Sequence, residues 1–159
     1  MANKVIASKG NNEVTRNDNP NMGMVSLFLS LPKNHVLYGQ SIDILKKVTD
    51  LDAVSAFGNH WQDTWYFRFD YAYDATSPFK DSHPLYKDEF AEEMLDCVKQ
   101  EKVLAQMKAQ LAANIDAMKE CVQTVAAEAD NHSALAKNFQ SISDLAKTSR
   151  ELLAILSPQ

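Results

Sequence analysis

Three side chains near the middle of the chain have the chemistry of a general acid–base site. His60 and Asp63 lie just before an aromatic stretch, and His83 follows it. An imidazole and a carboxylate can exchange a proton with a substrate near neutral pH if the fold brings them together, with Tyr66 or Arg68 orienting that substrate. The sequence favours the simpler interpretation, in which both histidines are loop residues.

The sequence predicts neither a metal site nor a cofactor. Glu128 and His132 are four positions apart and could face one another at a helix end. Two such ligands there are more typical of solvated capping residues than of a metal site. The four glycines are isolated, so no Gly-rich phosphate-binding loop is present in the sequence.

The two cysteines, Cys97 and Cys121, fall in what we expect to be one helix. The helical rise separates them by about 36 Å, too far for a disulfide within the chain. Both have the spacing of an apolar stripe, where a thiol behaves as a small hydrophobic group.

An acidic segment opens the C-terminal half and is the predicted interaction surface. Its carboxylates suit the start of a helix, where the backbone dipole favours negative charge, and would also suit a basic protein partner. Apolar residues alternate with them at helical spacing. The surface consists of Asp88, Glu89, Phe90, Glu92, Glu93, Met94 and Val98.

Composition and charge restrict the class of protein. The chain has 159 residues, 45% of them hydrophobic, with 16 basic and 21 acidic side chains and a net charge of −5. Chains of this length form one ordinary core. The acidic balance disfavours nucleic acid and anionic membranes as partners. No apolar segment has the length of a signal peptide or membrane span, so we expect a cytoplasmic protein.

Residues 1–22 are rich in Asn and poor in large apolar side chains, so we expect a flexible N-terminal arm. Residues 23–159 are expected to form a single domain, with its sheet part at 23–84. Period-two alternation predicts a strand at 24–31, and a short return strand is expected at 36–38.

After Ser41, an N-cap residue, near-helical spacing predicts a helix at 41–57 that could break near Thr49. The stretch at 62–73 has aromatic residues at every odd position from 65 to 73. This alternation predicts a strand with one aromatic face that is covered by other elements. Such a row is more typical of a core than of a ligand pocket.

Residues 85–157 contain neither Gly nor Pro and are rich in helix formers. Two antiparallel helices of about 45 and 25 residues are expected, separated near Asp130 to Ser133. Their unequal lengths leave part of the first helix without a helical partner. A second copy of the chain could cover it, so a homodimer through Phe90, Met94 and Val98 is expected, unless the sheet covers it instead.

The sequence therefore predicts an α+β fold in which a small antiparallel sheet packs against a long C-terminal antiparallel helical hairpin. The favoured function is a non-enzymatic protein–protein interaction or assembly protein acting through its long helices and acidic helix end, with an inhibitor, immunity or chaperone-like role. The alternative is a small-molecule binding protein or small enzyme with an aromatic-lined cleft near His60, Asp63 and His83.

Overall fold

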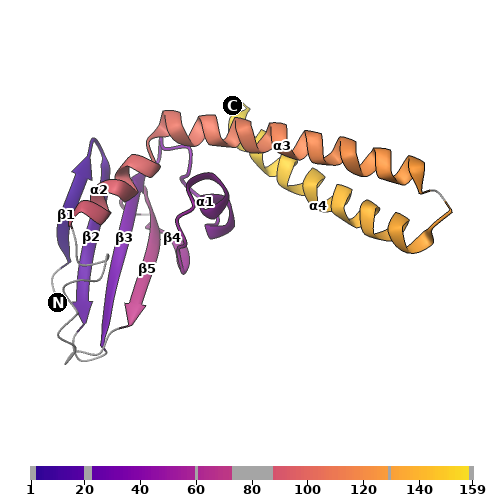
Figure 1. Cartoon of the computed structure of the whole chain (residues 1–159). Helices are drawn as coiled ribbons and strands as arrows, with labels where there is room; N and C mark the ends of the chain where they lie inside the picture. Colours follow the sequence, from indigo (N-terminus) through magenta and orange to yellow (C-terminus); the bar gives the residue numbers. More distant parts are fainter. Residues whose placement is uncertain (1–2, 20–22, 60, 73–87, 129, 158–159) are drawn as a thin grey trace. The chain divides into compact units, whose positions relative to one another are not determined.

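The computed structural model describes residues 3–19, 23–59, 61–72, 88–128 and 130–157. They form five strands and four helices, which confirms the α+β class (Figure 1). The chain divides into two compact units, and the boundary follows Val103, inside a helix. The first unit contains the sheet, and the second contains the helical hairpin.

The sheet is antiparallel and has the strand order β1-β2-β3-β5-β4 (Figure 1). Strands β1 to β3 follow one another along the chain, whereas β5 lies between β3 and the earlier strand β4. The strands are β1 (Lys4–Lys9), β2 (Asn12–Asn19), β3 (Met24–Pro32), β4 (Ser55–Asn59) and β5 (Thr64–Ala72).

The interpretation of residues 1–22 as a flexible arm is corrected by the first two strands. β1 and β2 form a hairpin around Gly10, whose positive φ of 61° suits a tight turn. Only Ala7 and Val14 are buried in this hairpin. A hairpin on the margin of a sheet gains its backbone hydrogen bonds from its neighbours, so a few apolar side chains suffice to place it.

One face of the sheet forms the core of the first unit. Val14, Leu29 and Phe67 are neighbours across three strands, and all three are fully buried. The predicted strands at 24–31 and 62–73 correspond to β3 and β5 over the described residues. The prediction that the odd positions of β5 face the core is confirmed at Phe67 and Phe69.

The segment between β3 and β5 differs from its prediction. Residues 36–38 form turns, so the expected return strand is wrong. The expected helix at 41–57 is only eight residues long: α1 (Ile42–Thr49) is capped by Ser41, whose Oγ accepts a hydrogen bond from the Ile44 N–H at 3.3 Å. It ends at Asp50, which adopts a left-handed conformation, and β4 follows.

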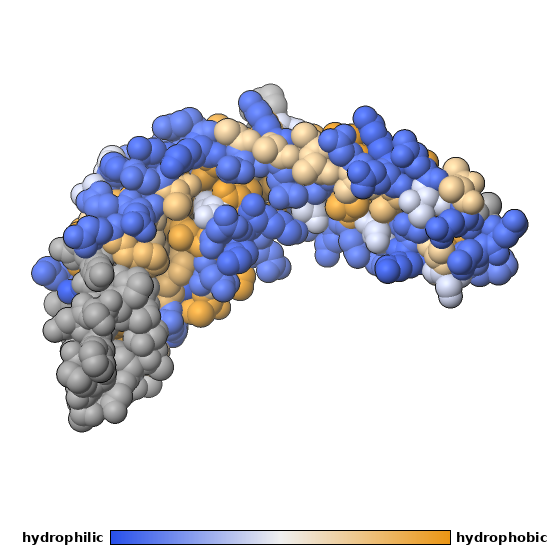
Figure 2. All heavy atoms as spheres, in the orientation of Figure 1, coloured by the Kyte–Doolittle hydropathy of each residue, from blue (hydrophilic) through white to orange (hydrophobic). Residues whose placement is uncertain are grey.

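Helix α2 (Asp88–Cys97) packs against β1 and β2. Asp96 of α2 accepts a hydrogen bond from Lys9, which lies on the same side of β1 as the buried Ala7. Helix α2 therefore contacts the core face of the sheet. In Figure 2, hydrophobic residues gather around α1 and the neighbouring strands. The buried side chains on and just after α2 are Ala91, Met94, Leu95 and Val98.

A break at residues 98–99 separates α2 from α3 (Gln100–Ala127). The Val98 carbonyl would accept a hydrogen bond from residue 102 in a continuous helix. Instead, the buried His35 donates from Nε2 to this oxygen at 2.7 Å, and its Nδ1 accepts from the Leu37 N–H at 3.1 Å. His35 therefore caps the C-terminal end of α2.

In the second unit, α3 and α4 (His132–Leu156) form the predicted helical hairpin. Asn131 caps α4 by accepting from the Ala134 N–H at 3.2 Å. The two helices have 28 and 25 residues, so the expected inequality of about 45 against 25 is wrong. The surplus length is the separate helix α2, which the sheet covers. The overhang thus provides no argument for a homodimer.

Candidate functional site: an aromatic hollow on the sheet

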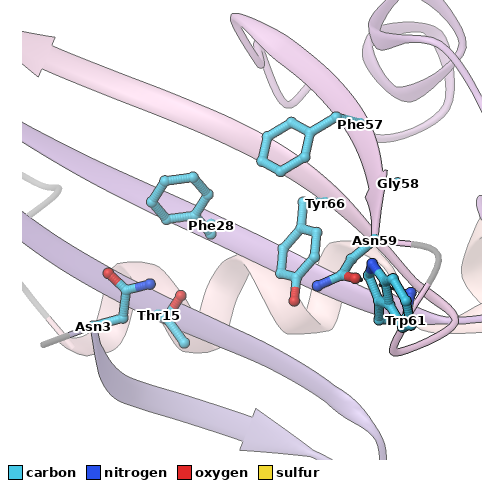
Figure 3. A pocket seen from close by; sticks show the side chains of 8 residues that line it. All are labelled: Asn3, Thr15, Phe28, Phe57, Gly58, Asn59, Trp61 and Tyr66. Atoms are coloured by element: carbon cyan, nitrogen blue, oxygen red, sulfur yellow. Dashed lines mark hydrogen bonds between the residues drawn. The ribbon is translucent and has the colours of Figure 1, made fainter.

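The second face of the sheet carries an open hollow of about 480 Å³. We call this face the open face. Figure 3 shows the aromatic side chains standing on it, with a helix passing behind the sheet. The hollow is lined by Asn3, Thr15, Phe28, Phe57, Gly58, Asn59, Trp61 and Tyr66.

Three aromatic rings form the floor of the hollow, and strand register brings them together. Phe57 is paired directly with Tyr66, and Phe28 lies opposite Arg68, one diagonal step from Tyr66. The Phe57 and Tyr66 rings stack with centroids 5.4 Å apart, and Phe28 meets Phe57 edge to face at 6.3 Å. These geometries are the favourable ones for aromatic pairs, so the floor is held in a defined shape.

The β4–β5 turn places Trp61 at the margin of the hollow. Asn59 accepts a hydrogen bond from the Trp61 N–H at 3.1 Å, and Asp63 takes a positive φ of 48°. The Gln62 side-chain oxygen accepts from both Asn59, at 3.2 Å, and the Tyr66 hydroxyl, at 3.2 Å. Trp61 itself is 97% exposed and Phe57 is 42% exposed. A large apolar area is therefore presented to solvent at the hollow.

A charged pair lies beside the aromatic floor. Arg68 donates two hydrogen bonds to the carboxylate of Asp70, which also accepts from Ser26 Oγ at 2.7 Å. The Arg68 hydrogen bond is the main cause that lowers the pKa of Asp70, with the Ser26 bond adding to it. The guanidinium is therefore held in place and neutralised locally, so it adds no net charge to the open face.

The predicted acid–base residues are only partly described. His60 and His83 lie outside the described residues. Asp63 is exposed and pairs with Lys33 at 3.7 Å. Trp61 and Tyr66, the aromatic residues of the hollow that are near Asp63 in sequence, lie on the open face. Trp65 points to the other face, where its Nε1 donates a hydrogen bond to the Gln40 carbonyl at 3.0 Å.

The predictions about metals and cysteines concern residues in the helices. Within the described ranges, no three His, Cys, Asp or Glu side chains converge as metal ligands would. Glu128 and His132 are both exposed at the α3–α4 turn. Cys97 and Cys121 are free and lie on two helices rather than one.

The predicted interaction surface on α2 divides into an exposed part and a buried part. Glu89, Glu92 and Glu93 are exposed, and Phe90 is half-buried. Met94 and Val98 are fully buried within the first unit. A partner could not reach these two side chains without displacing α2 from the sheet. Asp88 begins the helix.

Asp96, on the same helix, is already paired within the chain. It accepts hydrogen bonds from Lys9 Nζ at 2.6 Å and Lys99 Nζ at 3.1 Å. These bonds, that of Lys9 first, lower the pKa of Asp96 to about 2. Because the folded-state pKa is depressed, the pair stabilises the fold above the unfolded pKa of about 3.9, and this stabilisation is lost as the pH falls toward 2.

Lys9→Ala is expected to raise the pKa of Asp96 toward its ordinary value, because the larger of the two cationic contacts is removed. The measurement is an NMR titration of the side-chain carboxyl carbon. Lys46→Ala removes a lysine that bonds the Asp50 carbonyl instead, and serves as the control. An unchanged Asp96 pKa in Lys9→Ala would show that Lys9 does not hold this carboxylate in solution.

Comparison with known proteins gives no relative. No protein-family model, curated protein or solved structure matches the chain. In the part of the chain that the structure describes, no helix is long and apolar enough to cross a membrane.

Two of the floor residues were missed by the sequence analysis. The alternation of β3 places Phe28 on the polar side of its strand, and helical spacing places Phe57 at the end of a helix. The useful signal was Tyr66, which lies off the aromatic row of β5. Any aromatic residue on a neighbouring strand in the same register would join it.

Proposed function

We propose that this chain is a non-enzymatic binding protein that holds a protein partner on the open face of its sheet. The observation that supports this proposal is the aromatic cluster on the open face, in which Phe57 and Trp61 are exposed and Phe28 and Tyr66 are half-buried. Tyr and Trp are enriched among the side chains that contribute most to protein interfaces, since they bury large areas at little entropic cost. The partner is expected to insert an apolar side chain between Trp61 and the stacked rings.

The proposal moves the expected interaction away from α2. Phe57 and Trp61 are accessible, whereas Met94 and Val98 are buried. Homodimer formation, a basic partner and a cytoplasmic location stay predictions.

Photocrosslinking tests the proposal even though the partner is unidentified. A benzophenone amino acid in place of Phe57 is expected to give a protein adduct of discrete mass in native lysate. The same group in place of Val54, which is 53% exposed but does not line the hollow, is the matched control and should give none. Trp61→Ser should weaken capture by roughly 30-fold, the effect of removing a 2 kcal/mol contact. Equal adducts from positions 54 and 57 would contradict the proposal.

The volume of the hollow favours a second candidate function, the binding of a small molecule. About 480 Å³ lies within the range of ligand sites, and Asn59 and the Tyr66 hydroxyl are polar groups at its wall. Native mass spectrometry of protein purified from its source distinguishes the two functions. A bound mass that disappears in Trp61→Ser, together with no protein adduct at position 57, would establish this second candidate in place of the first.

A further inference from the structure

The α3–α4 hairpin has a seam that a buried polar pair defines. Asn114 Nδ2 donates to Ser149 Oγ at 3.3 Å, and both residues are buried. Gln110 donates to Asn114 Oδ1 at 2.9 Å, and Ser149 donates to the Leu145 carbonyl at 2.7 Å. The pair shows which side of each helix faces the other, so every other side chain can be placed relative to it.

Four large apolar side chains lie beside this seam yet remain 42–58% exposed: Ile115, Val122, Phe139 and Leu153. At 100° per residue, Ile115 and Val122 follow Asn114 by about 100° and 80° around α3. Around the axis of α4, Phe139 and Leu153 lie about 80° and 40° from Ser149, counted in the same rotational sense. In an antiparallel pair, equal rotations from the seam point to the same side. The four residues therefore share one face of the hairpin.

Cationic side chains lie next to these four residues. Lys108, Lys119, Lys147 and Arg150, all exposed, lie about 100–160° from the same reference residues in the same sense. They flank the apolar residues. Within the second unit, the acidic residues of α3 and α4 lie about 200–240° away, on the far side of each helix. They are Asp116, Glu120, Asp144 and Glu151. We call the surface formed by the four apolar and four basic residues the basic-apolar face.

The spacing and the charge of this face indicate its occupant. Ile115 and Val122 are one heptad apart, and Phe139 and Leu153 are two heptads apart, which is the spacing that a packed helix requires. A second copy would bring like charges together around the contact. Four cations are at the lower limit of the clusters of about four to eight that select anionic membranes, and the net charge of −5 opposes binding to such a surface. An amphipathic helix flanked by carboxylates meets both requirements.

We propose that the α3–α4 hairpin binds an amphipathic helix of another protein whose apolar stripe is flanked by Asp and Glu. This surface belongs to the second unit and is separate from the aromatic hollow of the first. The chain would thus have two independent binding surfaces.

The test uses the full chain and a designed fluorescent peptide of three heptads, with Leu at the core positions and Glu on both flanks. Fluorescence anisotropy should show saturable binding that weakens as salt is added. A peptide with the same Leu residues and Lys flanks should bind at least tenfold more weakly. Phe139→Ser should weaken the Glu-flanked peptide roughly tenfold. Equal binding of both peptides, or binding of neither, would overturn the proposal.

A charge reversal provides the matched control. Lys119→Glu should weaken binding of the Glu-flanked peptide severalfold and improve binding of the Lys-flanked one. Lys137→Glu makes the same change about 240° from the reference residue, off the basic-apolar face, and should leave both unchanged. Far-ultraviolet circular dichroism confirms that each variant keeps its helices.

Two further measurements identify the other occupants. Co-flotation with phosphatidylserine-containing vesicles that Lys119→Glu abolishes would show that the basic-apolar face binds a membrane surface instead of a helix. A dimer observed in sedimentation, if Phe139→Ser dissociates it, would show that the face binds a second copy of this chain instead. Either result would overturn the proposal.

Discussion

Phe67→Ala is expected to lower the free energy of unfolding of the first unit by about 3–5 kcal/mol. The ring is fully buried in β5, between Leu29 of β3 and Ala56 of β4. Its removal forfeits the transfer free energy of an aromatic side chain and leaves a cavity that the paired strands cannot close, because their spacing is fixed by backbone hydrogen bonds.

Urea unfolding followed by tryptophan fluorescence measures this loss. Both tryptophans of the chain, Trp61 and Trp65, belong to the first unit, so the signal reports on the sheet and not on the hairpin. Phe57→Ala is the matched control, because it removes the same side chain from the open face. The control should cost no more than about 1.5 kcal/mol. Equal losses in the two variants would show that the core does not lie on the face of Phe67.

His35→Ala is expected to have the second largest effect, about 2–4 kcal/mol on the same unfolding transition. The substitution leaves the Val98 carbonyl without its donor and the Leu37 N–H without its acceptor, and it opens space beneath the end of α2. The cost of a buried, unpaired polar group adds to that of the cavity. A loss below about 1 kcal/mol would show that water replaces the ring readily and that the cap has little energetic weight.

The same residue should make stability depend on pH. Burial lowers the pKa of His35, and the hydrogen bond to Val98 opposes this only in part. A proton on Nδ1 would also remove the acceptor of the Leu37 N–H. The unfolded state therefore binds the proton more readily, so the stabilisation is complete above the unfolded pKa of about 6.5 and declines as the pH falls below it.

Unfolding measured from pH 8 to pH 5 checks this dependence. The slope around pH 6 should be smaller in His35→Ala than in the unmodified chain. His132→Ala is the control, because His132 belongs to the second unit and the tryptophans report the unfolding of the first. A slope that persists in His35→Ala would assign it to other groups.

The sequence predicted those elements whose structure depends on residues close to one another in the chain. The alternation in β5 and the Ser41 cap of α1 needed no tertiary information. The division between α2 and α3 could not be predicted in this way, because no Gly or Pro marks it. The contact that accompanies it, His35 with Val98, joins residues 63 positions apart.

The aromatic hollow was hidden for a related reason. Phe28 and Phe57 meet Tyr66 only through strand register, and β4 is five residues long, too short for its alternation to outweigh helical spacing. The β1–β2 hairpin was missed because its sequence is polar. Its stability depends on β3 and α2, which the composition of residues 1–22 does not contain.

The order of strands in the sheet also constrains how the first unit folds. β4 follows β3 along the chain but is not its neighbour in the sheet, because β5 lies between them. The meander of β1 to β3 can form early from contacts local in sequence, whereas β4 has no place until β5 inserts. Joining these two pieces requires the closure of a long loop that contains α1, so this step is expected to limit the folding rate.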